Sequence, residues 1–446
     1  MKIKDYLSNK NSRFATVAMT DTNGLLRGQM LSVDNLKSVL KNGMGMAPAQ
    51  LALDPTDEIL HLPGVTDDDG DFHDGLLKLD EKSARSLPWS SPGHNLLILS
   101  QFSDETASIC PRSILQKILN RATKADITPR YGLELEYTLF DETEESAKAK
   151  GFRNLKTATP HKSHDLITYQ VLQSEWYQDV SEMCEKLDIK LSKMHEEIGG
   201  GFMEACVGAG TGTDPADQAV ILKNFLRILA MRQGRSATFM PRWSEQADSQ
   251  SMHVHMSFLD SKGKSLFYSA DGEHSMSEKF RHFIGGLQKY SGDLSLMFLP
   301  TVNSYRRFAP GTFAPPSLHW GFENRTTCFR VVGHTPDTLR VENRLAGSDV
   351  NPYFNVAATL AAGLEGVLNK IEPLPGIAGS GFVLPDAPSY CRSMPAAIRQ
   401  LRESTFAKKW FGERFVTTFS ASRESQLEAF SAKVPDIELE RFFGLV

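Results

Sequence analysis

The chain has 446 residues, of which 41% are hydrophobic and 23% are charged, and this composition is typical of a globular protein with room for two domains. The net charge of -5 and the lack of a Lys/Arg block argue against nucleic acid as the main partner. No apolar run approaches the roughly 20 residues of a membrane span, the first residues do not resemble a signal peptide, and the five cysteines form no CxxC pair. We therefore expect a cytoplasmic protein with no membrane or nucleic-acid partner.

The predicted secondary structure changes character along the chain. The first part is rich in strands, whereas helices begin after Pro111 and then alternate with strands. Asp214-Pro215 and Asn351-Pro352 each supply an N-cap followed by proline at the first helical position. The expected strands include 14–19 and 96–99, and the expected helices are 113–125, 214–234 and 352–368. The sequence predicts an α+β protein with a small domain at 1–105 and a large domain at 106–446.

Four segments place charged or imidazole side chains on one face of a strand. Successive side chains of a strand point to opposite faces, so Glu134 lies beside Glu136, and His253 lies beside His255 and Ser257. Arg340, Glu342 and Arg344 share a face in the same way. The segments are 133–137, 252–258, 340–344 and, less regularly, 195–204.

The shared faces indicate a metal site. Each pattern alone also fits the solvated side of an edge strand, but five carboxylates and a histidine together repel one another unless cations lie among them. Carboxylates with one imidazole and no cysteine favour Mg²⁺ or Mn²⁺ over zinc. Carboxylate-held cations beside guanidinium groups are what phosphoryl transfer from ATP requires. The nearby arginines are Arg307, Arg325, Arg330, Arg340 and Arg344.

Seven motifs in order give the chain a resemblance to a known family. They are 133–141 (LELEYTLFD), 195–204 (HEEIGGGFME), 238–241 (TFMP), 252–257 (MHVHMS), 303–311 (NSYRRFAPG), 324–330 (NRTTCFR) and 340–353 (RVENRLAGSDVNPY). On these residues the chain resembles the glutamine synthetase superfamily of class I type, in its γ-glutamyl amide ligase-like branch. The resemblance implies a β-grasp-like N-terminal domain and a catalytic domain with an open, mostly antiparallel β-barrel flanked by helices. It also implies a homo-oligomer, a dodecamer of two hexameric rings.

The same resemblance implies roles for individual residues. ATP and two or three Mg²⁺ or Mn²⁺ ions per site are the expected cofactors. One cation would be held by Glu136, Glu197 and Glu204, and the second by Glu134, His253 and Glu342. The nucleotide contacts would be His255, Ser257 and Arg340. The catalytic arginines would be Arg325 and Arg330 at the transferred phosphate, with Arg307, and the amino-acid contacts would be Arg307, Arg344 and Asp248.

The chemistry implied by the resemblance is amide synthesis in two steps. A carboxylate is a poor acyl donor, so ATP first phosphorylates it, and an amine then displaces phosphate. Cations and arginines stabilise the phosphoryl transfer, and exclusion of water protects the acyl phosphate. Glutamate, activated at its γ-carboxylate, is the expected acid substrate.

The chain departs from the family pattern where ammonia-using members bind ammonium. Those members carry a glutamate two residues after the glycine of the motif at 303–311, whereas this chain has Phe313. They also carry an N-terminal aspartate, whereas the comparable stretch 44–49 (MGMAPA) contains no acid. These departures favour a pocket for an organic amine, alkyl or aryl, with Phe313 in its wall, although Phe313 could instead pack into a rearranged loop.

Two alternatives remain open at this stage. An ordinary ammonia-dependent glutamine synthetase would conflict with Phe313 and with the acid-free stretch at 44–49. A non-catalytic, ring-forming relative would be expected to have lost metal ligands, yet all six are present. Glu196, which follows the motif's histidine, is predicted to be solvent-facing or structural rather than a ligand.

Overall fold

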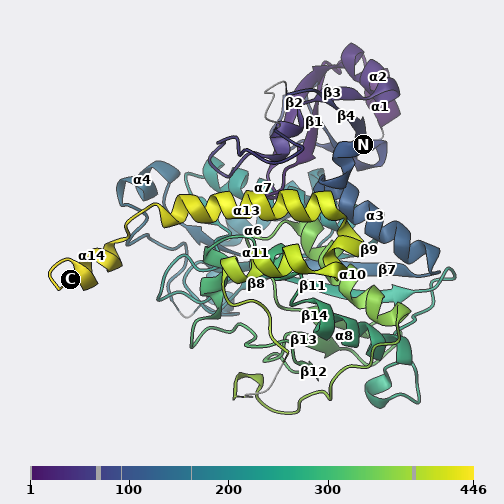
Figure 1. Ribbon diagram of the computed structural model, residues 1–446. Helices are drawn as coiled ribbons and strands as arrows, with labels where there is room; N and C mark the ends of the chain where they lie inside the picture. The colour runs from purple at the N-terminus through teal and green to yellow at the C-terminus, as the bar shows by residue number, and fades with distance from the viewer. Residues whose placement is uncertain (1–2, 67–71, 92, 162, 384–387, 446) are drawn as a thin grey trace.

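The computed structural model describes residues 3–66, 72–91, 93–161, 163–383 and 388–445. Figure 1 shows an N-terminal unit that stands on one side of a larger body, with the C-terminal segment crossing between them. Each part is built around its own sheet, and the first sheet has six strands in the order β2-β1-β6-β4-β3, with β5 beside β6. Its strands are β1 (Phe14–Thr20), β2 (Leu26–Ser32), β3 (Met44–Met46), β4 (Gly75–Leu79), β5 (Arg85–Ser86) and β6 (Leu96–Phe102).

The N-terminal sheet is held together by a small apolar cluster under one helix. Strand β1 pairs in parallel with β6, while its other neighbour β2 is antiparallel. Ser32 caps the helix α2 (Val33–Asn42) by accepting a hydrogen bond from the backbone N–H of Asn35. Leu36 of that helix is buried against Val17 and Ile98 of the sheet. This packing anchors the unit independently of the second sheet.

The second sheet has eight strands and forms the wall of the larger body. Its order is β12-β13-β14-β11-β7-β9-β8, with β10 beside β7, and every pair is antiparallel except β12–β13. The strands are β7 (Thr128–Phe140), β8 (Leu191–Glu196), β9 (Phe202–Thr211), β10 (Ser236–Thr238), β11 (Met252–Leu259), β12 (Trp320–Phe322), β13 (Phe329–Val332) and β14 (Arg340–Asn343).

Alternation along the central strands separates the core from the charged face. Leu133, Leu135 and Tyr137 of β7 are at most 1% exposed and join the main apolar core, whereas Glu134 and Glu136 point to the other side. Strand β11 follows the same rule, with its apolar residues in the core. The core face is covered by helices, so the charged face is left for the site.

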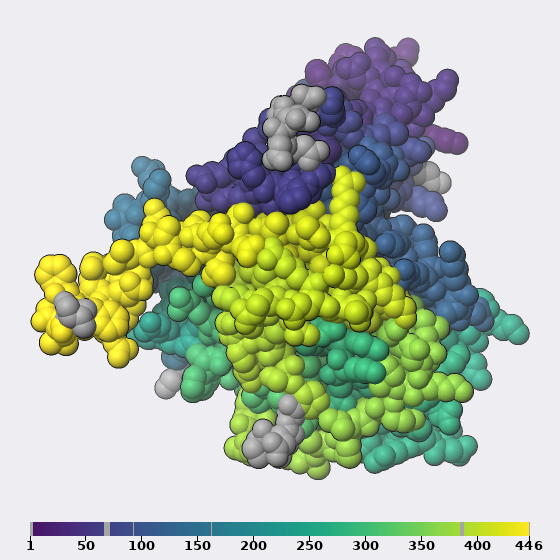
Figure 2. Space-filling view, in the orientation of Figure 1, coloured from purple at the N-terminus to yellow at the C-terminus, as the bar shows by residue number. Residues whose placement is uncertain are grey.

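Helices surround the sheet, and two of them approach unusually closely. Gly286 of α8 and Gly366 of α10 face each other, and a Cβ atom built on Gly286 would lie 2.7 Å from the backbone of Gly366. The helices are α1 (Ile3–Ser8), α3 (Pro111–Lys124), α4 (Glu144–Ala149), α5 (Ile167–Leu172), α6 (Ser174–Lys186), α7 (Asp214–Arg232), α8 (Glu278–Tyr290), α9 (Ser295–Phe298), α10 (Pro352–Leu368), α11 (Met394–Glu403), α12 (Thr405–Phe411), α13 (Glu413–Ser431) and α14 (Asp436–Phe442). Figure 2 shows the end of the chain extending away from the body.

The predicted strands and helices are confirmed to within a few residues, as is a mixed α/β chain with a half-barrel sheet. The segment 195–204 is the exception, because β8 ends at Glu196 and β9 begins at Phe202, with a turn between them. The expected helices 113–125, 214–234 and 352–368 correspond to α3, α7 and α10. The β-grasp description of the N-terminal unit remains a prediction. No helix in the described ranges combines the length and the apolar composition needed to cross a membrane.

Candidate active site

Strand register brings the charged residues of the sequence motifs into one row. His253 of β11 lies opposite Glu134 of β7, and His255 lies opposite Glu342 of β14. On the other side of β7, Glu136 lies opposite Glu204 of β9. Neighbouring strands are about 4.8 Å apart, so side chains that share a face at these positions come within contact distance.

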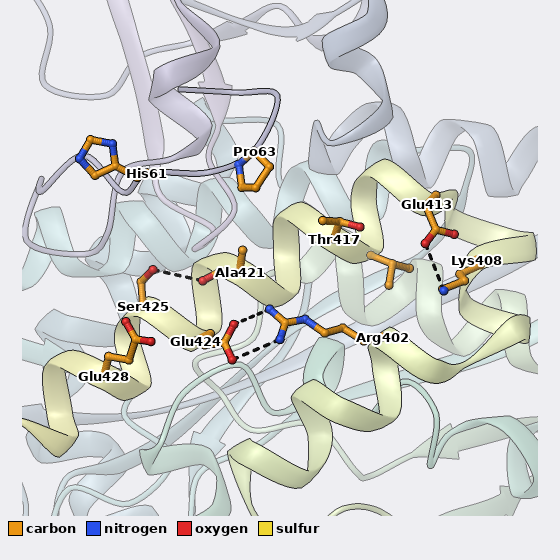
Figure 3. Close-up of a pocket in the computed structure, with 11 residues that line it drawn as sticks. His61, Pro63, Arg402, Lys408, Glu413, Thr417, Ala421, Glu424, Ser425 and Glu428 are labelled. Atoms are coloured by element: carbon orange, nitrogen blue, oxygen red, sulfur yellow. Dashed lines mark hydrogen bonds and ion pairs between the residues drawn. The ribbon is translucent and has the colours of Figure 1, made fainter. Parts of the chain in front are cut away.

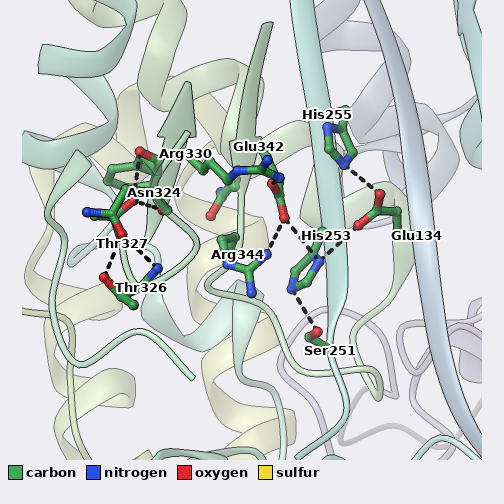
Figure 4. A network of polar contacts seen from close by, with 12 residues as sticks. Glu134, Ser251, His253, His255, Asn324, Thr326, Thr327, Arg330, Glu342 and Arg344 are labelled. Atoms are coloured by element: carbon green, nitrogen blue, oxygen red, sulfur yellow. Dashed lines mark hydrogen bonds and ion pairs between the residues drawn. The ribbon is translucent and has the colours of Figure 1, made fainter. Parts of the chain in front are cut away.

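One group of ligand atoms forms around His253. Its Nδ1 atom lies 3.1 Å from Glu134 Oε2 and 3.4 Å from Glu342 Oε1, and its Nε2 atom lies 2.8 Å from the hydroxyl of Ser251 (Figure 4). His253 and Glu342 are 4% and 1% exposed, so the group is shielded from solvent. The structure thus brings together the three residues expected at the second cation, and their atoms are close enough to share one ion.

The residues expected at the first cation form two overlapping groups. Glu136 and Glu204 come together with His253, while Glu197 and Glu204 come together with His195. Burial and the nearby Glu197 carboxylate raise the pKa of Glu136 to about 8. Burial and neighbouring carboxylates raise the pKa of Glu204 to about 9. A divalent cation bound among such closely spaced, buried carboxylates would neutralise their negative charge.

A glycine turn sets the position of Glu197 beside the sheet. Gly201 has a φ of +64°, and a Cβ atom there would lie 2.2 Å from the carbonyl oxygen of Leu139. Without a side chain, the turn after β8 packs directly on β7, and the backbone N–H of Glu197 donates to Phe202 at 2.7 Å. The turn therefore holds the Glu197 carboxylate over the β7–β9 pair.

The structure adds two members that the sequence reasoning did not include. His195 Nε2 lies 3.0 Å from Glu197 Oε1, and Cys206 donates its thiol hydrogen to Glu204 Oε1 at 3.2 Å. The sulfur of Cys206 and one carboxylate oxygen each of Glu134 and Glu204 also lie within 4.8 Å of one another, close enough to share one ion. The expectation that no cysteine accompanies the carboxylates was therefore wrong, and the period-2 spacing from Glu204 to Cys206 was the signal that could have shown it.

The structure decides between the two alternatives that were predicted for Glu196. Its side chain is only 2% exposed, so it is not solvent-facing, and burial raises its pKa. Strand β8 ends at this residue, and its side chain alternates with His195 onto the opposite face. Glu196 belongs to none of the groups that could hold an ion in the described chain, which agrees with the prediction of a structural residue rather than a ligand.

The two arginines expected at the transferred phosphate lie in different environments. Arg330 of β13 pairs with Glu342 at 3.0 Å and with Glu323 at 2.7 Å, so its guanidinium adjoins the metal-ligand group. Arg325 is exposed in the turn between β12 and β13 and forms no ion pair with the described residues. Only Arg330 is brought to the carboxylate cluster.

The two arginines expected to bind the amino-acid substrate are linked by a hydrogen bond from the side chain of one to the backbone of the other. Arg344 pairs with Glu342, and Arg307 is 1% exposed. The two terminal nitrogens of Arg307 donate to the carbonyl oxygens of Leu345 at 3.1 Å and Arg344 at 3.0 Å. Direct contact of Arg307 with a substrate remains a prediction, and these bonds give Arg307 the further role of positioning Arg344.

A cavity of about 320 Å³ adjoins the cluster on the side expected for the nucleotide. Its walls include His255, Ser257 and Arg340, together with Glu134. His255 Nε2 lies 2.8 Å from Glu134 Oε1, and Arg340 donates from Nε to His255 Nδ1 at 3.1 Å. The three residues expected to contact nucleotide therefore share one wall beside the metal-ligand residues.

At the expected amine position the wall is aromatic. Phe313 is 46% exposed, and its ring meets the edge of Phe382 with centroids 5.7 Å apart. The Arg344 guanidinium lies 5.9 Å from the Phe313 ring centroid. Asp248 accepts hydrogen bonds from the backbone N–H groups of Phe313 at 3.2 Å and of Ser249 at 2.7 Å, which ties the expected acid-binding loop to the Phe313 loop.

A second cavity, of about 570 Å³, lies between the N-terminal unit and α13 (Figure 3). Both of its basic residues are paired with acids of the same wall: Arg402 donates to Glu424 at 3.2 Å, and Lys408 lies 3.1 Å from Glu413. None of the groups that could hold a metal in the described chain contributes to its lining. The carboxylate cluster on the second sheet is therefore the candidate active site.

Comparison with known proteins gives the class of the chain. Residues 108–442 match the glutamine synthetase catalytic domain. Relatives include a type-1 glutamine synthetase from Dictyostelium discoideum, 30% identical over 100% of this chain and 87% of the relative. A γ-glutamylethanolamide synthetase from Streptomyces coelicolor is 30% identical over 96% and 92%. A glutamate–isopropylamine ligase from a Pseudomonas species is 25% identical over 100% and 98%.

A solved structure shows the same fold. The chain of a GmaS/ADP complex superposes with a TM-score of 0.85 at 23% identity and covers 98% of this chain and 97% of its own. The chain belongs to the glutamine synthetase family. It is an ATP-dependent carbon–nitrogen ligase, as the motifs predicted.

Proposed function

We propose that this ligase joins the γ-carboxylate of glutamate to an organic amine with an apolar alkyl or aryl group, through a γ-glutamyl phosphate. The observation that carries the proposal is the exposed aromatic pair of Phe313 and Phe382 beside Arg344. An apolar wall gains free energy by covering hydrocarbon, whereas a small ammonium ion requires carboxylates around it. The names of two relatives, an ethanolamide synthetase and an isopropylamine ligase, support an organic amine.

In this proposal each group of residues has a separate task. The residues around His253 and Glu204 would hold two or three Mg²⁺ or Mn²⁺ ions, which supply electrostatic stabilisation of phosphoryl transfer. His255, Ser257 and Arg340 would contact ATP. Arg330 would neutralise charge on the transferred phosphate, with Arg325 reaching it from its exposed turn. Arg307, Arg344 and Asp248 would bind glutamate, and Arg307 would also hold Arg344 in place.

The proposal also covers the domain boundaries, the localisation and the oligomeric state. We propose that residues 1–105 and 106–446 are separate domains, and that the enzyme is a cytoplasmic dodecamer of two hexameric rings. An oligomer is supported by apolar side chains that lie exposed at the projecting end of the chain, where a second subunit could cover them (Figure 2). They are Ile437, Leu439, Phe442, Phe443 and Leu445.

An assay of phosphate release from ATP tests which amine the enzyme uses. Purified enzyme with glutamate and Mg²⁺ is offered ammonium, putrescine, an alkylamine and aniline, and the amide product is identified by mass spectrometry. We expect kcat/KM to be highest for an alkylamine or arylamine. Ammonium as the best substrate would instead make this chain a glutamine synthetase, as some relatives are named, and putrescine as the best substrate would also contradict the apolar pocket.

A further inference from the structure

A third cavity, of about 220 Å³, lies where the N-terminal unit meets the larger body. Basic side chains from two distant helices reach its wall: Lys223 and Arg227 from α7, and Arg423 from α13. Residues of the N-terminal unit, including Thr22 and Asn23, line another part of it. None of these residues belongs to the proposed metal, nucleotide or glutamate contacts.

Two of the bases are almost fully buried without an acidic partner. Lys223 is 2% exposed, and its ammonium donates to the carbonyl oxygens of Ser348 at 2.7 Å and Val350 at 3.0 Å. Arg423 is also 2% exposed and donates to the side-chain oxygen of Asn23 at 2.9 Å. Neither lies within 4.0 Å of a carboxylate in the described chain. Asp349 acts on both bases, but only from beyond the distance of an ion pair. Buried cations without a close counter-charge are costly, so an anion bound in the cavity would stabilise them.

Arg227 is the third base and the least satisfied one. Its guanidinium lies 5.1 Å from the Phe239 ring centroid and makes no hydrogen bond with the residues that the structure describes. Burial lowers its pKa, and burial together with the neighbouring Arg227 lowers the pKa of Lys223 to about 7. Burial also lowers the pKa of Arg423 to about 10. Burial is the largest cause of all three shifts, and a like charge contributes only at Lys223, through Arg227.

One acid, Asp349, lines the same cavity and is already engaged. Its Oδ2 atom accepts hydrogen bonds from the hydroxyls of Thr301 at 2.6 Å and Ser304 at 2.7 Å. Asp21 also acts on Arg227 and Arg423, but it lies outside the lining of the cavity and pairs with Arg27 at 2.8 Å. Among the lining residues three basic groups therefore face one carboxylate, an excess of two positive charges when all four are ionised. The volume corresponds to about seven water molecules at roughly 30 Å³ each.

We propose that this cavity is a binding site for a small dianion that carries carboxylate or phosphate groups, held by Lys223, Arg227 and Arg423. Guanidinium groups suit both kinds of oxyanion because they can donate two parallel hydrogen bonds. The excess charge matches a dianion, and the enclosed walls favour a compact molecule over a polymer.

The site is connected to the proposed metal centre. Lys223 donates to the carbonyl oxygen of Ser348, and the hydroxyl of Ser348 donates to the backbone carbonyl of Glu136, one of the expected metal ligands. An anion that draws the Lys223 ammonium toward the cavity would act on the segment that supports Glu136. We therefore assign the dianion the role of an effector that alters divalent-cation affinity.

Calorimetric titration and thermal unfolding of the full-length enzyme test this proposal. The probes are sulfate, inorganic phosphate and succinate, with neutral succinamide as the uncharged counterpart of succinate. Binding of sulfate and phosphate alone would identify a tetrahedral oxyanion, and binding of succinate would identify a dicarboxylate. Either result supports the site, provided that the variants respond as follows.

The Arg227→Met variant is decisive because it removes charge without removing a hydrogen bond to a described residue. We expect the dissociation constant to rise about tenfold or more in Arg227→Met, as for loss of a charge-assisted hydrogen bond, and likewise in Arg423→Met. Arg402→Met removes an arginine from the larger, charge-paired cavity, and Arg330→Gln alters the catalytic cluster. Both should bind the dianion as the wild type does.

Two results would overturn the proposal. The first is a lack of saturable binding of all three anions by the wild type. The second is binding that Arg330→Gln abolishes and Arg227→Met leaves unchanged, which would place the anion at the catalytic cluster. A supporting result also requires that the bound dianion change the Mg²⁺ dissociation constant of the wild type and leave that of Arg227→Met unchanged.

Discussion

Glu136 and Glu204 lie directly opposite each other in the antiparallel pair of β7 and β9, and both carboxyls are buried. Burial and neighbouring carboxylates raise both pKa values, to about 8 for Glu136 and about 9 for Glu204. The metal-free enzyme therefore holds protons here at neutral pH. A divalent cation must displace them, which couples metal binding to pH.

The first prediction concerns the stability of the metal-free enzyme. Between the ordinary pKa near 4.5 and about 8 to 9, the folded state holds protons at Glu136 and Glu204 that the unfolded state has released. Stability then falls as pH rises through this window, since the folded state binds more protons. In EDTA we expect the melting temperature to fall by about 5 °C between pH 6 and 9.

Mg²⁺ should reverse this trend, because the cation stabilises the ionised carboxylates and binds better as protons leave. Differential scanning fluorimetry with and without Mg²⁺ across the pH range measures the effect. The Glu136→Gln variant, which cannot ionise at that position, should show a shallower pH dependence in EDTA. A melting temperature in EDTA that rises from pH 6 to 9 would contradict the assignment.

The second prediction separates Glu342 from Glu323. Both carboxylates pair with Arg330, but only Glu342 adjoins His253 and Glu134. Glu342→Gln should lower kcat about a hundredfold or more and weaken Mg²⁺ binding, because a metal ligand loses its charge. Glu323→Gln is the matched control and should change kcat by about threefold or less. Equal losses in the two variants would show that the pairing with Arg330, and not metal ligation, matters.

The sequence was sufficient to predict the grouping around His253 and not the packing that supports it. Period-2 alternation determines which residues of one strand share a face, and the family resemblance implied that Glu134, His253 and Glu342, from three strands, hold one cation. The hydrogen bonds from Arg307 to the 344–345 backbone depend on how a loop folds over β14. Likewise, Lys223 and Arg423 are 200 residues apart, and only tertiary packing brings them to one cavity.

The third prediction concerns metal preference and Cys206. Its thiol donates to Glu204, and its sulfur lies within 4.8 Å of a Glu134 carboxylate oxygen, so a thiophilic cation bound there could gain a sulfur ligand. Cys206→Ser should weaken Cd²⁺ binding about tenfold or more and leave Mg²⁺ binding nearly unchanged, because Mg²⁺ prefers oxygen. Competitive titration with a metal-sensitive dye measures both constants.

Cys184→Ser provides the control for the loss of a buried thiol. Cys184 is 2% exposed and belongs to the apolar core, outside the groups that could hold an ion in the described chain. We expect this variant to keep both metal affinities. Unchanged Cd²⁺ affinity in Cys206→Ser would show that the thiol only supports Glu204 by its hydrogen bond.

The fourth prediction tests whether Phe313 determines the choice of amine. Phe313→Glu places a carboxylate beside Arg344 at the position where ammonia-using members carry an acid, so it should attract a small ammonium ion and repel apolar groups. We expect the ratio of kcat/KM for ammonium to that for the best organic amine to rise about tenfold or more. Phe313→Leu keeps the wall apolar and should retain the wild-type preference. If Phe313→Leu and Phe313→Glu lowered activity with every amine by the same factor, Phe313 would be a packing residue of its loop, and amine selection would reside elsewhere in the pocket.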